Sequence, residues 1–302
     1  MGLTRRALFR MLAAAGAGGS PPAVGAQAIA RRPIPSSGEP IPVVGLGTWR
    51  TFDVGGAAAE RAPLREVLRR FVADGGSVID SSPMYGAAES VVGDLAAGLG
   101  LAGRLFLATK VWTTGREAGV SQMEESFRRL RAARLDLMQV HNLVDWRTHL
   151  RTLRTWKESG RIRYLGVTHY TASAHDDLER VLRAEPVDFV QVNYSVGERH
   201  AERRLLPLAR DRGVAVLANR PFAEGGLLQR LGSRPLPAWA VEIQCETWAQ
   251  LLLKWILGHP AVTCVIPATR RPEHVADNMR AGLGTLPDET MRARIAAAAT
   301  AG

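Results

Sequence analysis

The sequence predicts an α/β fold, a (β/α)8 TIM barrel with a short N-terminal hairpin. The 302-residue chain is 46% hydrophobic, which is enough for a sizeable core. Short apolar runs bounded by turn residues alternate with helix-like segments, in eight successive units. Such alternation predicts a parallel sheet with right-handed crossovers, and eight units predict closure into a barrel.

A doubly wound open sheet is the competing architecture. Such a sheet usually carries a Gly-x-Gly-x-x-Gly motif directly after its first strand, where the glycines approach a dinucleotide phosphate. No such motif follows the first predicted strand, residues 43–48. The barrel is therefore favoured.

The chain is expected to divide at residue 28. Residues 1–28 contain paired arginines, Arg5 and Arg6, ahead of a weakly apolar run that ends in Ala26-Gln27-Ala28, a small-residue cleavage pattern. This segment resembles a bacterial twin-arginine signal, which implies a periplasmic or otherwise exported protein that contacts the twin-arginine export machinery. A basic leader without an export role is the alternative. Residues 29–302 form the expected barrel domain.

The elements of this domain follow in order. After a Pro-rich linker, residues 33–43 are expected to form the hairpin, with its turn at Ser36-Ser37-Gly38-Glu39. The predicted barrel strands are 43–48, 77–80, 105–111, 135–141, 163–169, 188–194, 214–219 and 262–267. The predicted helices are 63–73, 87–98, 121–132, 147–158, 174–184, 201–211, 246–258, 272–281 and 288–299. The connection 223–245 is long and rich in Gly and Pro, so we expect a lid or ligand clasp there.

Composition excludes several classes of protein. The formal net charge is +10, but the cations are dispersed and no recognition motif accompanies them, so nucleic-acid binding is not expected. Beyond the N-terminus no apolar run reaches the length of a membrane span, so none is expected after cleavage. Cys245 and Cys264 match neither a disulfide framework nor a metal site by spacing. Whether they pair stays open, and no metal is expected.

Reactive side chains end three successive strands of the predicted barrel. Asp80 ends one strand and Tyr85 follows it, while Lys110 and His141 end the next two. In a β/α barrel the loops at the carboxyl ends of the strands build the active site, so these side chains are expected at one face. Taken singly, Asp80 could cap a helix, Tyr85 could pack at a rim, Lys110 could extend to the surface and His141 could be a core histidine. Their convergence favours a catalytic role.

Together these residues suit proton delivery to a carbonyl group. The ordinary pKa of tyrosine is ~10, and a nearby lysine ammonium stabilises the phenolate, so the hydroxyl proton is given up more easily. Asp80 would keep Lys110 charged and aimed, and His141 could donate a hydrogen bond to a substrate oxygen. No zinc cluster or Gly-x-Ser-x-Gly elbow is present, which disfavours hydrolysis.

The motif Asp80-Ser81-Ser82-Pro83-Met84-Tyr85-Gly86, with Lys110 and His141 after it, resembles the Asp-Thr-Ala-x-x-Tyr-Gly signature of the aldo-keto reductase superfamily. The resemblance covers essentially the whole mature chain. It implies a (β/α)8 barrel that binds NADPH or NADH at its carboxyl face without a Rossmann motif. It further implies that Tyr85 is the general acid, that Lys110 and Asp80 tune it, and that His141 orients the carbonyl. The hypothesis is an NAD(P)H-dependent oxidoreductase that reduces an aldehyde or ketone to an alcohol.

The resemblance also implies contacts to the nicotinamide. They fall on Gly47, Thr48, Trp49, Thr168, His169, Gln191, Asn219, Arg220 and Pro221. Thr168 and Gln191 match positions that bind the carboxamide, whereas His169 stands where the family usually has Asn. Asn219 stands where most members carry an aromatic residue that stacks on the ring. Arg220 could reach the ring or the pyrophosphate instead.

The adenosine end of the cofactor is implied to contact Ala268, Thr269, Arg270, Asp277 and Asn278. Members that prefer NADPH often carry Lys at the position of Ala268 and Arg at that of His274. Thr269, Arg270 and Arg271 could still bind a 2′-phosphate, because arginine is a good phosphate ligand. NADPH is therefore preferred, with NADH as the alternative.

The substrate pocket is expected beyond the strand ends, lined by Trp49, Met84, Trp112 and Asn142. This lining suggests an apolar, small-molecule carbonyl substrate, although the tryptophans could equally pack beneath a loop. The enzyme is expected to be a monomer. A second hypothesis is a barrel that holds a nicotinamide cofactor without turnover, as a binding or redox-sensor protein. The missing stacking aromatic and the export signal motivate it.

Overall fold

The computed structural model describes residues 28–301, so the expected export signal lies outside the described residues except for Ala28. The strands are β1 (Arg31–Pro33), β2 (Pro40–Pro42), β3 (Leu46–Gly47), β4 (Val78–Asp80), β5 (Phe106–Val111), β6 (Leu135–His141), β7 (Ile162–His169), β8 (Phe189–Asn193), β9 (Ala215–Asn219) and β10 (Cys264–Val265). The α-helices are α1 (Ala58–Ala73), α2 (Ala88–Gly98), α3 (Arg116–Leu130), α4 (Trp146–Glu158), α5 (His175–Ala184), α6 (Leu205–Asp211), α7 (Gly226–Leu231), α8 (Trp248–Leu257), α9 (Pro272–Arg280) and α10 (Glu289–Thr300). Within this range no helix is both long and apolar enough to cross a membrane.

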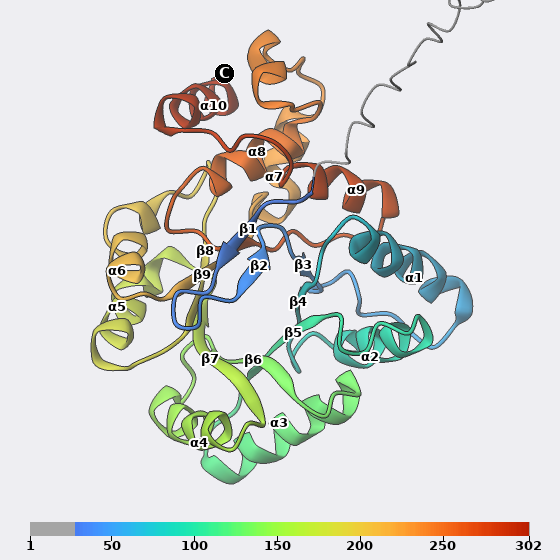
Figure 1. The fold of residues 1–302 in the computed structure, drawn as a ribbon, viewed down its shortest axis with the longest axis vertical. Helices are drawn as coiled ribbons and strands as arrows, with labels where there is room; N and C mark the ends of the chain where they lie inside the picture. Colours follow the sequence, from blue (N-terminus) through green and yellow to red (C-terminus); the bar gives the residue numbers. More distant parts are fainter. Residues whose placement is uncertain (1–27, 302) are drawn as a thin grey trace, which may run out of the picture.

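The strands β3 to β10 form one parallel sheet in chain order, with helices around it (Figure 1). The sheet closes because the segment that leads into β3 pairs with β10. The backbone N–H of Gly45 donates to Val265 O at 2.8 Å, and that of Val265 donates to Val43 O at 2.9 Å. The predicted (β/α)8 barrel is confirmed, and its parallel strands bring all their carboxyl ends to one face.

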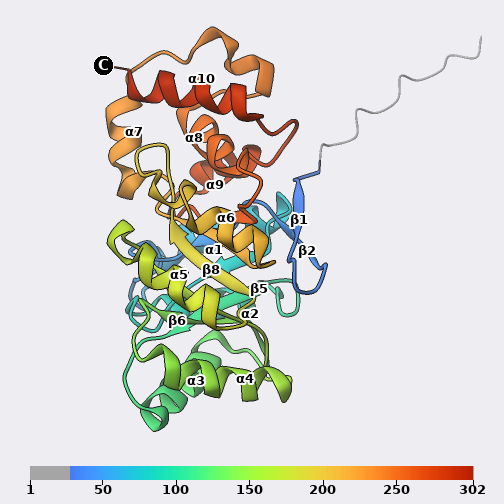
Figure 2. The ribbon, with the colours of Figure 1, turned by 90° about the vertical axis from the view of Figure 1, so that its left-hand side faces the viewer.

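The hairpin of β1 and β2 closes the opposite, amino-terminal end of the barrel (Figure 2). Its Ile34 and Ile41 are buried in the same cluster as Phe106, Tyr164 and Phe189, which lie near the beginnings of their strands. The expected hairpin at 33–43 is thus present, and it fills the end of the barrel that carries no reactive side chains.

Two helices begin five residues earlier than the sequence pattern predicts. Helix α1 begins at Ala58 rather than residue 63, because the alanines and Glu60 before Pro63 are good helix formers. Helix α3 begins at Arg116 rather than residue 121, directly after Gly115, whose φ of 83° favours glycine. Both differences lengthen helices on the outside of the barrel and leave the strand ends unchanged.

The long connection 223–245 contains helix α7 and short 3₁₀ turns, which the sequence pattern did not predict. Arg234 anchors this connection to the last helix, since its guanidinium donates to Ala301 O at 2.7 Å and to Ala298 O at 3.1 Å. The segment is therefore a packed part of the fold rather than an open loop.

Three glycines at 98, 100 and 103 do have the Gly-x-Gly-x-x-Gly spacing. They lie where α2 ends and the chain turns into β5, so they connect a helix to a strand. A dinucleotide fingerprint requires the reverse order, strand to helix, and lies at the carboxyl end of its strand. This match is therefore not a phosphate loop.

Candidate functional site

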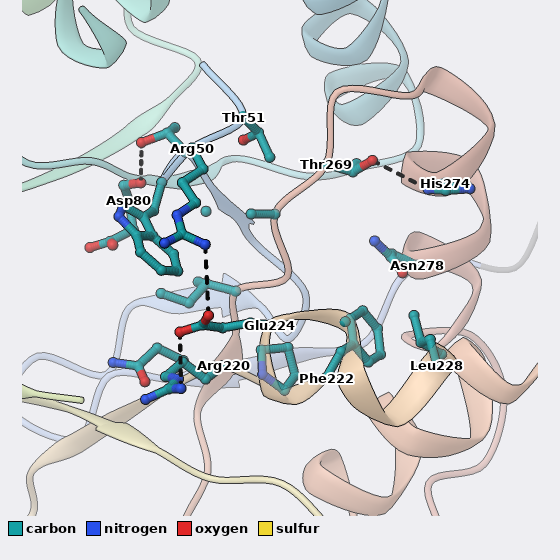
Figure 3. A pocket seen from close by; sticks show the side chains of 18 of the residues that line it. Arg50, Thr51, Asp80, Arg220, Phe222, Glu224, Leu228, Thr269, His274 and Asn278 are labelled. Atoms are coloured by element: carbon teal, nitrogen blue, oxygen red, sulfur yellow. Dashed lines mark hydrogen bonds and ion pairs between the residues drawn. The ribbon is translucent and has the colours of Figure 1, made fainter. Parts of the chain in front are cut away.

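A cavity of about 920 Å³ opens at the carboxyl ends of the barrel strands (Figure 3). Most of the residues expected in the site line it: Gly47, Thr48, Trp49, Asp80, Met84, Tyr85, Trp112, His141, Asn142, Thr168, Gln191, Asn219, Arg220, Pro221, Ala268, Thr269, Asp277 and Asn278. Lys110 is fully buried behind the cavity wall. His169 and Arg270 do not belong to the lining.

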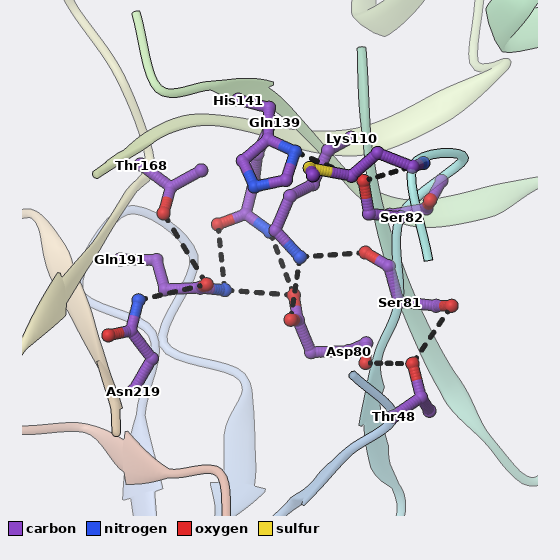
Figure 4. Close-up of polar contacts among 12 residues, drawn as sticks. Thr48, Asp80, Ser81, Ser82, Lys110, Gln139, His141, Thr168, Gln191 and Asn219 are labelled. Carbon is purple, nitrogen blue, oxygen red and sulfur yellow. Dashed lines mark hydrogen bonds and ion pairs between the residues drawn. The ribbon is translucent and has the colours of Figure 1, made fainter. Parts of the chain in front are cut away.

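Asp80 and Lys110 form a buried ion pair at the floor of this cavity (Figure 4). Lys110 Nζ donates to Asp80 Oδ2 at 2.6 Å and to Ser81 O at 2.7 Å. Burial acts to lower the pKa of Lys110, but the Asp80 carboxylate and Tyr85 outweigh it, so the pKa is raised above its ordinary value. Lys110 is therefore charged at neutral pH, as a buried ammonium can be only beside a partner.

Tyr85 lies against this pair. Lys110 Nζ is 5.0 Å from the centre of the Tyr85 ring. Burial raises the pKa of the Tyr85 hydroxyl, whereas the Lys110 charge acts to lower it. Of these two opposing effects burial is the larger, whereas only the effect of the cation can be anticipated from the sequence. Tyr85 is protonated at neutral pH, which is the state that a general acid requires.

His141 is a buried, neutral imidazole edge-on to Tyr85, with ring centroids 5.8 Å apart. Burial and then the Lys110 charge lower the pKa of His141 to about 2. Ser82 Oγ lies 3.1 Å from His141 Nδ1 and accepts a hydrogen bond from Met84 N at 3.4 Å. Within the described chain the Ser82 hydroxyl has no other acceptor for its proton, so Ser82 donates to Nδ1. His141 then carries its own proton on Nε2 and can donate it to a ligand.

Side-chain amides complete the surroundings of Asp80. Its Oδ1 accepts hydrogen bonds from Gln139 Nε2 at 3.1 Å and from Gln191 Nε2 at 2.8 Å. Gln191 Oε1 in turn accepts from Thr168 Oγ1 at 3.4 Å and from Asn219 Nδ2 at 3.2 Å. The ends of β6, β7, β8 and β9 are thereby linked to the ion pair.

Two residues that were expected to contact the cofactor, His169 and Arg270, form hydrogen bonds to loops of the protein instead. His169 Nδ1 accepts from the backbone N–H groups of Tyr170 at 3.0 Å and Thr171 at 3.3 Å, and so stabilises the turn after β7. Arg270 donates to Arg50 O at 2.9 Å, which joins the segment before α9 to the loop after β3.

The expected adenosine contacts lie at the α9 side of the cavity, where Figure 3 shows Thr269, His274 and Asn278 together. Thr269 Oγ1 is 3.5 Å from His274 Nδ1. Asp277 lines the cavity, but its carboxylate accepts from Thr247 Oγ1 at 2.9 Å and Gln250 Nε2 at 2.6 Å. Asp277 therefore fixes α9 against α8.

The long connection after β9 forms one wall of the cavity through Glu224, Gly225, Leu228, Gly232, Arg234 and Leu236. The Glu224 carboxylate lies 3.0 Å from the Arg220 guanidinium and 3.8 Å from that of Arg50 (Figure 3). Arg50 follows β3, so these ion pairs join the two sides of the cavity mouth.

The expected substrate residues form an apolar rim. Trp49, Met84 and Trp112 are 36%, 38% and 42% exposed, so their faces are open to a ligand rather than packed beneath a loop. Trp112 also lies beside His141, with ring centroids 6.4 Å apart. Asn142 follows His141 directly, with a φ of 52°.

Sequence reasoning did not single out Ser82 and Gln139. Ser82 carries a signal in the sequence, because it replaces the alanine of the family signature with a hydroxyl group. Gln139 lies two residues before His141, and strand alternation directs both side chains to the same face. Neither signal shows that Ser82 pairs with His141 Nδ1 or that Gln139 pairs with Asp80 Oδ1, because these contacts depend on the three-dimensional arrangement.

We expect the protein to lose stability in acid through His141. Between the folded-state pKa of about 2 and the ordinary value of 6.5, the unfolded chain binds a proton that the folded chain does not. Stability therefore falls as the pH falls. From pH 7.5 to 4.5 this group alone removes about 2 to 3 kcal/mol. In urea denaturation at both pH values, His141→Gln should lose less stability than the wild type over this interval. Equal losses would show that His141 is not held neutral.

Comparisons with known proteins identify the family. The model of the "Aldo/keto reductase family" matches residues 43–298. Methylglyoxal reductase YeaE of Escherichia coli K12 is 30% identical over 245 residues, which are 79% of this chain and 84% of the relative. An aldo-keto reductase of Mycobacterium sp. JLS is 29% identical over 255 residues, 80% of this chain and 84% of the relative. The structure of an aldo-keto reductase from Klebsiella pneumoniae in complex with NADPH has a TM-score of 0.74 and 28% identity, and the match covers 89% of this chain and 94% of that one. The chain belongs to the aldo/keto reductase family.

Proposed function

We propose that the protein is an NADPH-dependent oxidoreductase that reduces a small aldehyde or ketone to an alcohol. One observation carries the proposal: a charged Lys110, paired with Asp80, lies beneath a protonated Tyr85 and beside a neutral His141. The NADPH complex of the Klebsiella neighbour supports the choice of cofactor, and the methylglyoxal reductase among the relatives supports a small carbonyl substrate.

The polar groups of the cavity fit a nicotinamide dinucleotide. Thr51 Oγ1, Asn142 Oδ1, Asn219 Oδ1 and Arg220 Nε are buried atoms of lining residues, and none has a partner within residues 28–301. Buried polar groups are normally hydrogen-bonded, so these atoms indicate a polar ligand. Thr269 and Asn278 would hold the adenosine end, and Thr168, Asn219 and their neighbours the nicotinamide end.

When bound, NADPH supplies a hydride from its nicotinamide ring to the carbonyl carbon. Tyr85 donates its hydroxyl proton to the carbonyl oxygen as negative charge builds there. The phenolate left on Tyr85 is stabilised by the Lys110 ammonium, and a proton from solvent restores the hydroxyl. His141 donates from Nε2 to the same carbonyl oxygen and so orients the substrate.

The rim favours a carbonyl compound with a small or apolar body. Trp49, Met84 and Trp112 offer apolar surface in the cavity that Tyr85 also lines, and Asn142 adds an amide oxygen that has no partner within residues 28–301. A substrate would place its oxygen between Tyr85 and His141 and its remaining atoms against this rim. Pockets that combine an apolar wall with few polar groups are typical for small ligands.

We expect Tyr85→Phe to lower kcat about 10²- to 10⁴-fold, the contribution that a positioned general acid usually makes. The measurement is NADPH consumption at 340 nm with a nitrobenzaldehyde or methylglyoxal as substrate. Because Phe keeps the ring, the Kd for NADPH should stay close to that of the wild type. Tyr164→Phe, at the amino-terminal end of the barrel, is the matched control and should keep its kcat.

Full activity in Tyr85→Phe would refute the assignment of the acid. A wild type that retains nucleotide through purification but never consumes NADPH with any aldehyde would favour the cofactor-holding alternative. Mass analysis of the nucleotide that copurifies identifies the cofactor in either case.

We also propose that residues 1–28 direct export through the twin-arginine route. The paired Arg5 and Arg6, and the small-residue pattern Ala26-Gln27-Ala28 at the end of the apolar run, support this proposal. That route requires the arginine pair, so replacing both by lysine should keep the protein in the cytoplasm. Immunodetection in cell fractions measures the distribution. Equal export of the wild type and the double variant would contradict the proposal.

A further inference from the structure

Asn219 lines the cavity and carries an acceptor that has no partner within residues 28–301. It ends β9, its Nδ2 donates to Gln191 Oε1 at 3.2 Å, and Figure 4 shows the two side chains next to each other. Its Oδ1 is buried and has no hydrogen-bond partner in the described part of the chain. A buried acceptor without a donor costs about 1 to 3 kcal/mol, so a ligand that brings a donor would relieve this cost.

The charge of Asp80 determines which of the two amide atoms of Asn219, Nδ2 or Oδ1, has no hydrogen-bond partner in the described chain. An ionised carboxylate only accepts hydrogen bonds, so Gln191 must direct its Nε2 to Asp80 Oδ1, at 2.8 Å. Gln191 Oε1 is then the atom nearest Asn219, and a carbonyl oxygen also only accepts. The Nδ2 group of Asn219 must therefore donate its hydrogen bond to Gln191 Oε1. This orientation leaves Asn219 Oδ1 without a partner among the described residues. The orientation of both amides follows from one buried charge.

Gln191 itself has no free hydrogen-bonding position. Its Nε2 donates to Asp80 Oδ1 and, at 3.4 Å, to Gln139 Oε1. Its Oε1 accepts from Thr168 Oγ1 and Asn219 Nδ2. The glutamine that the family resemblance assigns to the carboxamide is thus occupied within the protein, and the nearest unpaired acceptor of this network is on Asn219.

We infer that Asn219 Oδ1 accepts a hydrogen bond from the carboxamide N–H of the nicotinamide ring, in place of the aromatic stacking that most family members use at this position. The inference rests on the proposed function. Asn219 is two hydrogen bonds from Asp80, so it lies at the reacting end of the cavity. The carboxamide is the N–H donor that the cofactor carries at that end. Asn219 thus recognises the nicotinamide ring through a directed hydrogen bond, and this recognition requires the N–H of the carboxamide.

The test uses two nucleotides that differ only in this donor. Reduced 3-acetylpyridine adenine dinucleotide phosphate has a methyl ketone in place of the carboxamide and therefore lacks the N–H. The Kd of each nucleotide is measured by quenching of tryptophan fluorescence, without turnover. We expect the wild type to bind NADPH about tenfold more tightly than the analogue, the size of one hydrogen bond to a buried acceptor. Asn219→Leu, which has a similar volume and no acceptor, should bind the two nucleotides with equal affinity.

Asn219→Ala serves as a second variant that also lacks the acceptor. Because this substitution only removes atoms, it still allows the two nucleotides to be compared if the leucine variant does not fold. Asn278→Ala is the matched control at the adenosine side. It should weaken both nucleotides by the same factor and leave their ratio at about ten, since they share that half.

Two outcomes would overturn the inference. The first is a wild type that binds both nucleotides equally, and the second is a tenfold preference that persists in Asn219→Leu and Asn219→Ala. In both cases NADPH still binds, so the proposed function would stand. A wild type that binds neither nucleotide would instead contradict the proposed function, and the inference with it.

Discussion

The site depends on one buried carboxylate. Asp80 lies inside the barrel with Lys110 on one oxygen and the amides of Gln139 and Gln191 on the other. A charge in such a position must be compensated, and each group that compensates it is oriented in turn. Through Lys110 the carboxylate places a cation beneath Tyr85. Through Gln191 it sets the direction of Asn219. A single charge therefore organises both the proton-donating side and the cofactor side of the cavity.

Burial and charge together set the protonation states around Asp80. Burial favours the neutral form of every ionisable group, and it prevails at Tyr85 and His141. Lys110 is the exception, because Asp80 and Tyr85 outweigh its desolvation. At neutral pH the site therefore contains one buried cation, Lys110, and two neutral hydrogen-bond donors, Tyr85 and His141, which line the same cavity. A carbonyl oxygen that gains negative charge is the group that such an arrangement stabilises best.

The fold was predictable because it follows from local patterns. Alternating apolar strands and amphipathic helices predicted the barrel, and strand ends predicted which side chains share a face. Quantities that depend on tertiary distances were not predictable. The net pKa direction of Tyr85 needed its burial, and the His141 tautomer needed the position of Ser82. The occupation of His169 by its own turn, and the helix inside the connection 223–245, likewise depend on packing that no local pattern encodes. The roles of the site residues stay predictions.

The most direct test of this account is a double-mutant cycle on Asp80 and Lys110, read as the free energy of unfolding in urea. Asp80→Asn leaves a buried ammonium without its counter-charge, and Lys110→Met leaves a buried carboxylate, so each single change should cost about 3 to 5 kcal/mol. The double variant removes both charges and should cost well under the sum of the two, by at least about 2 kcal/mol. Additive losses, or single losses below about 1 kcal/mol, would contradict the claim that this ion pair organises the site.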